Sequence, residues 1–97
     1  MSTLDSQYRI IIPAEVLRAC VIDLNEEVFL YHYTDYKPNA LLLTNRKNLE
    51  LKCFGVLIFD NKSRFCLHKE IRSEFNITKK TKLSIYGYAG QLVIELL

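Results

Sequence analysis

The chain contains a degenerate tandem repeat whose two copies lie 55 residues apart. Residues 5–9 and 60–64 both read D-x-x-x-R, and each is followed by a short apolar run, a glutamate and an isoleucine. The same shift superimposes further identical residues: Glu15 on Glu70, Ile22 on Ile77, Tyr31 on Tyr86 and Tyr33 on Tyr88. A repeat of about half the chain length predicts two copies of one supersecondary unit, each completing the core of the other.

Each copy predicts the order β-α-β-β. The first copy gives a strand, a short helix and a hairpin at residues 8–12, 13–20, 28–33 and 40–44. The second copy gives a leading strand and then the same elements at residues 52–59, 64–67, 68–75, 83–88 and 92–96. The first copy has so little sequence before Asp5 that its own leading strand is expected to be missing or a stub.

The expected fold is mixed β/α and mostly β. Helices this short are unstable alone, and two separate sheets would each leave exposed edges. We therefore expect the two β-α-β-β half-units to interleave around an approximate two-fold axis. The result would be a small barrel-like sheet with the two helices packed at its sides.

The length of 97 residues fits one domain, 1–97, with half-units at residues 4–44 and 50–97. Nearly half of the residues are hydrophobic and a quarter are charged, which is typical of globular chains. No apolar run approaches the roughly 18 residues of a membrane span, and the polar N-terminus does not resemble a signal peptide. We therefore expect a cytoplasmic protein with no membrane partner.

The net charge of +2 is unevenly distributed. Residues 1–48 carry five basic and six acidic side chains, whereas residues 49–97 carry eight basic and five acidic ones. A surface that binds a polyanion is therefore expected to lean toward the second half. On charge alone, a solvated basic face explains the pattern equally well.

The three cysteines, Cys20, Cys53 and Cys66, are widely spaced among apolar neighbours. They form neither a C-x-x-C motif nor a Cys/His cluster. The spacing predicts buried, reduced thiols that pack as small hydrophobic side chains.

The two copies resemble the AbrB/MazE/MraZ swapped-hairpin superfamily. The family pattern is D-x-x-G-R, an apolar strand, P-x-E-[IL]-R and an isoleucine before a polar turn. The chain is similar to it from Asp5 to Ile22 and from Asp60 to Ile77, and the resemblance covers roughly residues 4–44 and 59–96. Tandem copies resemble MraZ in particular, without its helical insert, whereas AbrB-like and MazE-like proteins build the barrel as a homodimer. The resemblance implies a swapped-hairpin barrel and a DNA-binding transcriptional regulator.

The chain departs from the family pattern at positions that matter for function. The glycine before the arginine is Tyr8 in one copy and Ser63 in the other. The helix arginine is replaced by Leu17 in the first copy, with Arg18 beside it, and is kept as Arg72 in the second. These departures favour an alternative: a protein-interaction module, antitoxin-like or for oligomer assembly, on the same fold with DNA binding weakened or lost.

Six basic residues are the expected DNA contacts: Arg9, Arg18, Lys62, Arg64, Lys69 and Arg72. The resemblance implies this role for Arg9 and Arg64, and we expect the other four beside them on one surface, where they would contact phosphates. Arginine makes bidentate contacts with phosphate and guanine. We expect most of the affinity from phosphate neutralisation, and sequence preference from arginine–base contacts and DNA shape.

Structural roles compete with this interpretation. Asp5 and Asp60 can cap backbone N–H groups and pair with the arginines of their own motifs. The helix cations can form a solvated face, and we expect a solvated loop for three further lysines, Lys79, Lys80 and Lys82.

The remaining titratable residues form no pattern typical of a catalytic site, and we expect neither an enzyme nor a metal or other cofactor. Glu15 and Glu70 suit helix N-termini, and His32 and His68 have no acidic or cysteine partner at ligand spacing. No glycine-rich phosphate loop, nucleophile elbow or zinc motif is present. The hairpin tyrosines are expected to pack across strands.

The expected partners are double-stranded DNA and further copies of the chain, because a weakly charged chain needs more than one copy for useful affinity. The alternative partner is a protein such as a toxin. The expected location is the cytoplasm, in association with the nucleoid.

Overall fold

The computed structural model describes residues 2–97 and is mostly β, with two short helices. The first half contains β1 (Ser2–Thr3), β2 (Arg9–Ile11), α1 (Ala14–Ala19), β3 (Val28–His32) and β4 (Ala40–Thr44). The second half contains β5 (Cys53–Leu57), β6 (Arg64–Cys66), α2 (Lys69–Glu74), β7 (Lys82–Tyr88) and β8 (Gln91–Leu96). The predicted order of elements is confirmed, and β1 is the stub expected before Asp5.

Strands of the two halves are interleaved in one six-stranded sheet with the order β1-β7-β8-β4-β3-β5. This order reads the same from either edge when each strand is exchanged for its repeat copy. The register follows the repeat as well, since Ser2 faces Leu83 and their counterparts Leu57 and Val28 face each other. The two halves are therefore related by an approximate two-fold axis between β4 and β8, which pair antiparallel at the centre of the sheet.

The strands β2 and β6 form a separate two-stranded antiparallel pair, called here the β2–β6 ribbon, in which Ile10 faces Phe65. Two backbone hydrogen bonds extend it symmetrically. The N–H of Ile12 donates to the carbonyl of Ser63 at 3.1 Å, and the N–H of Leu67 donates to the carbonyl of Tyr8 at 2.9 Å. The six-stranded sheet itself is open, with β1 and β5 at its edges, so a closed barrel stays a prediction.

The main core is built by side chains of both halves. Ile10 and Phe65 enter it from the β2–β6 ribbon, and Leu30, Leu41 and Ile94 enter it from the sheet. Alternate residues of the same strands form a smaller buried cluster on the other face of the sheet: Phe29, Tyr31 and Leu42, together with Leu51. Strands β3 and β4 are covered on both faces of the sheet, so their sequences are nearly continuous apolar runs rather than alternating ones.

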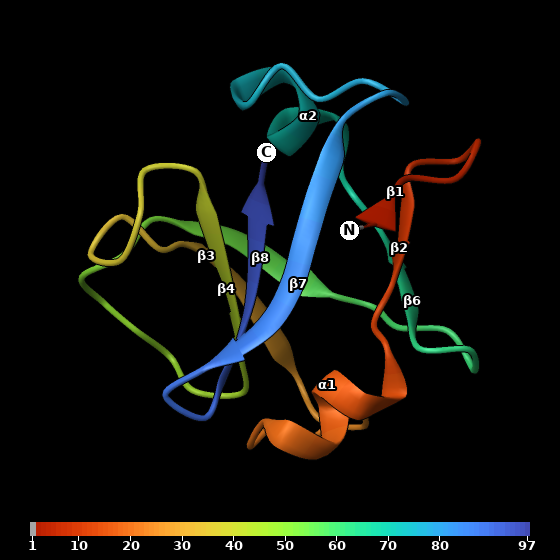
Figure 1. The fold of residues 1–97 in the computed structure, drawn as a ribbon. Coiled ribbons are helices and arrows are strands. Elements are labelled where there is room, and N and C mark those ends of the chain that lie inside the picture. Colours follow the sequence, from red (N-terminus) through yellow and green to blue (C-terminus); the bar gives the residue numbers. More distant parts are fainter. Residues whose placement is uncertain (1) are drawn as a thin grey trace.

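Both helices have only six residues, so their stability depends on packing rather than on helix propensity. Ile71 of α2 is buried in the core. At the end of α1, Cys20 approaches β7, where a Cβ on Gly87 would lie 3.1 Å from the cysteine sulfur. Each helix follows one strand of the antiparallel β2–β6 ribbon, so α1 and α2 lie at opposite ends of the molecule (Figure 1). Neither helix has the length and apolar character required to traverse a bilayer in the described residues 2–97.

The prediction of buried cysteines is wrong for two of the three. Cys53 and Cys66 are exposed, and Cys20 is half-buried; all three are free thiols. Cys66 alternates with Phe65 along β6, so it faces outward because the phenylalanine faces the core. Cys53 begins the edge strand β5, which has a neighbour on one side.

Candidate nucleic-acid interface

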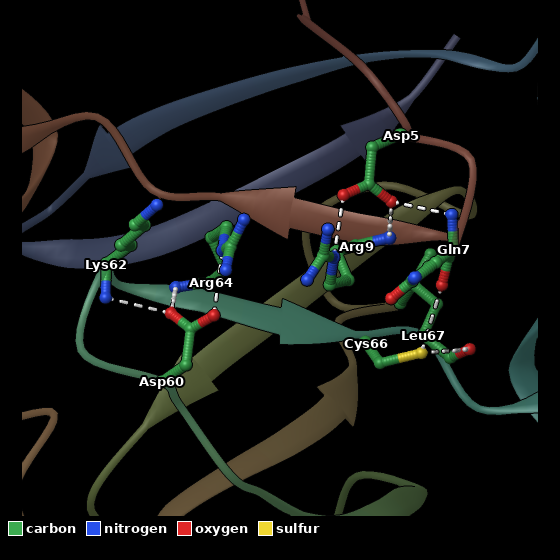
Figure 2. A network of polar contacts seen from close by, with 8 residues as sticks. All are labelled: Asp5, Gln7, Arg9, Asp60, Lys62, Arg64, Cys66 and Leu67. Carbon is green, nitrogen blue, oxygen red and sulfur yellow. Dashed lines mark hydrogen bonds and ion pairs between the residues drawn. The ribbon is translucent and has the colours of Figure 1, made fainter.

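Each D-x-x-x-R motif forms a turn that its own aspartate stabilises. Asp5 Oδ1 accepts the backbone N–H groups of Gln7 and Arg9 at 2.8 and 2.9 Å, and its Oδ2 accepts Arg9 Nε at 2.7 Å. The second motif repeats the arrangement (Figure 2): Asp60 accepts the N–H groups of Lys62 and Arg64 at 2.9 and 3.0 Å and Arg64 Nε at 2.7 Å. The backbone cap and the ion pair expected for these aspartates are both present.

Arg9 and Arg64 lie on the outward face of the β2–β6 ribbon. Directly opposed residues share a face, and Arg9 faces Cys66 while Ile11 faces Arg64. These four residues are called here the arginine face. Figure 2 shows both guanidinium groups on it, between the two aspartates. Among residues 2–97, no hydrogen bond engages the terminal Nη atoms of either arginine. Each guanidinium group is therefore held at Nε, and its two Nη atoms form an open fork that can bind a ligand.

The aspartates that hold these arginines are stabilised in the charged form. For Asp5, the N–H of Arg9 is the main cause that lowers the pKa of the carboxyl, against an opposing effect of desolvation. For Asp60, desolvation acts to raise the pKa, but the hydrogen bonds from Arg64 and Lys62 together outweigh it and lower the pKa to about 2. Both ion pairs are partly exposed, with side-chain exposures of 21% for Arg64 and 30% for Arg9. Such pairs add little to stability, so their main effect is to orient the arginines.

The other candidate residues are distributed over both ends of the β2–β6 ribbon. Lys62 is exposed in the turn directly before β6, and Lys69 is exposed at the start of α2. Arg18 lies in the last turn of α1, at the opposite end of the molecule from α2 (Figure 1). The structure therefore does not bring Arg18 next to Lys69 and Arg72.

Arg72 lies over the ring of Tyr8, with its guanidinium carbon 4.1 Å from the ring centroid. Lys79 Nζ lies 5.7 Å from the same centroid. Because Tyr8 immediately precedes Arg9, this arrangement places two further cations beside the Asp5 turn. The sequence assigned Lys79 to a solvated loop, since nothing local connects it to residue 8; the contact crosses from one half to the other.

Groups that suggest other chemistry have structural partners. Residues 2–97 contain no cluster of three or more His, Cys, Asp or Glu side chains that could hold a metal ion. Glu15 and Glu70 lie in the first turns of their helices, as predicted. His32 Nε2 donates to the carbonyl of Pro38 at 2.7 Å, and its ring packs edge-on against Phe75.

Comparisons of the chain with protein-family models, with curated proteins and with solved structures find no match. The resemblance to the swapped-hairpin superfamily therefore rests on the repeated motif residues alone.

Proposed function

We propose that the protein is a DNA-binding transcriptional regulator of the AbrB/MraZ type, with a swapped-hairpin barrel built from two tandem half-units. The observation that carries the proposal is the arginine face. Two guanidinium groups, each fixed through Nε by an aspartate, extend open forks from adjacent antiparallel strands. Arginine forks of this kind suit bidentate contacts with phosphate or guanine.

The shape of this surface supports duplex DNA as the ligand. A two-stranded β-ribbon fits the major groove, which is about 12 Å wide. The approximate two-fold axis of the β2–β6 ribbon would coincide with the local two-fold symmetry of the duplex, so Arg9 and Arg64 would make equivalent contacts with opposite strands. Lys69 and Arg72 at the α2 end, and Arg18 and Lys62 at the α1 end, would contact flanking phosphates.

The weak net charge of +2 limits the electrostatic affinity of one chain. We therefore include homo-oligomerisation in the proposal, because linked copies raise affinity without new contacts. In this account the protein works in the cytoplasm on the nucleoid.

A protein-interaction module is the second candidate function. The observation that favours it is an open crevice beside Ser63, whose counterpart in the other half is filled by the chain itself.

A genomic-fragment pull-down at two salt concentrations, combined with size measurement of the free protein, tests the primary proposal. We expect retention near 50 mM salt and strong loss near 200 mM, as counterion release dictates, and a size larger than one chain. If no fragment is retained at the lower salt concentration, the DNA-binding proposal fails.

A further inference from the structure

The approximate two-fold axis relates two crevices that are filled differently. The first lies between the Asp5 turn and the segment from α2 into the following turn, and the ring of Tyr8 occupies it beneath Arg72 and Lys79. The second lies between the Asp60 turn and the corresponding segment after α1, where Ser63 stands in place of the tyrosine. Here the structure has a cavity of about 630 Å³. The chain fills one crevice with an aromatic side chain and leaves its counterpart open.

The walls of the open crevice differ from those of the filled one in charge. Leu17 and Leu24 occupy the positions of the two cations that cover Tyr8, and with Ile22 and Phe59 they make an apolar floor. Asp23 and Asp60 stand at its rim. Asp60 pairs with Arg64, whereas Asp23 has no ion-pair partner in the described chain, residues 2–97. The open crevice is therefore lined by half-buried apolar side chains together with exposed acidic ones.

Both sides of the open crevice are held in place by hydrogen bonds. The side chain of Asn45 accepts the N–H of Asp23 at 2.7 Å and donates to the carbonyls of Asp23 and Glu27, both at 2.8 Å. On the other side, the N–H of Ser63 donates to the carbonyl of Asp60 at 3.1 Å. Ser63 has a φ of 57°, close to the 59° of Tyr8. Its Cβ therefore projects as that of Tyr8 does, and the space that a tyrosine would fill is preserved without the tyrosine.

We propose that the crevice beside Ser63 binds an aromatic side chain, flanked by basic residues, from a segment of a partner protein. The aromatic group would take the place that Tyr8 takes in the other half, against the apolar floor. The basic neighbours would supply the cations that Arg72 and Lys79 supply there, and Asp23 would face them. This site lies along the wall between the Asp60 turn and α1, so it leaves the Nη atoms of Arg9 and Arg64 on the arginine face free.

The test is an NMR titration of the whole, isotope-labelled protein with a capped lysyl-tyrosyl-lysine peptide, using capped lysyl-alanyl-lysine as the charge-matched probe. We expect the tyrosine peptide to shift the backbone amides of Asp23, Asn25 and Asn61, and to bind at least about tenfold more tightly than the alanine peptide. Equal binding of both peptides would show attraction of charge only and would overturn the proposal, as would no shift at these amides.

Two variants at position 63 test whether the peptide binds in this crevice. Ser63→Tyr should fill the crevice from within, as Tyr8 does, and abolish the shifts, whereas Ser63→Gly keeps the crevice open and should retain them. Leu24→Lys provides a second route if the tyrosine variant does not fold, because it copies Lys79 onto the wall and should weaken binding of the basic peptide about tenfold. Unaltered binding in the folded blocking variants would overturn the proposal. A change of self-association in Ser63→Tyr, without loss of peptide binding, would identify a second copy as the occupant and also overturn it.

Discussion

Tyr8 and Ser63 occupy the same position in the two repeats and share a left-handed backbone, with φ angles of 59° and 57°. In each case the N–H of this residue donates to the carbonyl of the motif aspartate at 3.1 Å and closes the turn before the arginine. In the D-x-x-G-R pattern that the two copies resemble, this position is a glycine, which adopts the left-handed conformation without steric cost. The turn geometry is thus common to both halves, while the two side chains have taken different roles.

Ser63→Gly is expected to stabilise the protein by about 0.5–1 kcal/mol, because a left-handed conformation costs an L-residue more than it costs glycine. The measurement is the free energy of unfolding from urea denaturation. Ser73→Gly is the matched control, since Ser73 lies in α2 and the same substitution should cost about 0.5 kcal/mol there. A loss of stability in both variants would contradict a strained turn at position 63.

Asp60 should make stability depend on acid pH. Its folded-state pKa of about 2 lies below the ordinary value of 3.8, because the hydrogen bonds from Arg64 and Lys62 outweigh desolvation. A lowered pKa stabilises the fold above pH 3.8, and that stabilisation is lost as the pH falls toward 2. Thermal melts of Asp60→Asn between pH 5 and 2 should therefore show a flatter decline than the wild type.

Asp35→Asn is the control for this acid dependence, since Asp35 is exposed in the β3–β4 connection and forms no ion pair within residues 2–97. It should decline as the wild type does. Parallel curves for wild type and Asp60→Asn would show that the carboxyl is not stabilised in its charged form.

Gly87→Ala should reveal the close approach of α1 to β7. The new methyl group would lie 3.1 Å from Cys20 Sγ, so we expect a cost of about 1 kcal/mol from overpacking. In a Cys20→Ala background the same change should cost little, because the opposing atom is gone. A double-mutant cycle of unfolding free energies measures this coupling; identical costs in both backgrounds would mean that the two residues do not press on each other.

Much of the secondary structure could be predicted because its signals are local. The strand at 40–44 is observed with its predicted bounds, and the helix predicted at 13–20 is observed as Ala14–Ala19. The partners of these strands could not be read in the same way. The strands β2 and β6 pair separately from an open six-stranded sheet. This arrangement depends on contacts between the two halves, and no pattern among neighbouring residues predicts such contacts.

The same distinction applies to the candidate site. The Asp–Arg pairs follow from a spacing of four residues and a turn, so the sequence was sufficient to predict them. The contact of Arg72 with Tyr8 joins opposite halves and appears only in the fold. The tyrosines show both cases, since Tyr86 donates to Glu95 on the neighbouring strand while its hydroxyl also lies 3.0 Å from that of Tyr36 in the other half.

The most direct test of the DNA-binding account is the salt dependence of DNA affinity for Arg9→Ala/Arg64→Ala beside Arg46→Ala/Lys47→Ala. Both double variants remove two positive charges, but Arg46 and Lys47 are exposed in the β4–β5 connection, outside the arginine face. We predict that the first pair weakens binding at least about tenfold and reduces the slope of log K against log salt by about two, with a much smaller effect of the second pair. Equal effects of the two double variants on DNA affinity would contradict the account. Binding by Arg9→Ala/Arg64→Ala that is as tight as that of the wild type would contradict it as well.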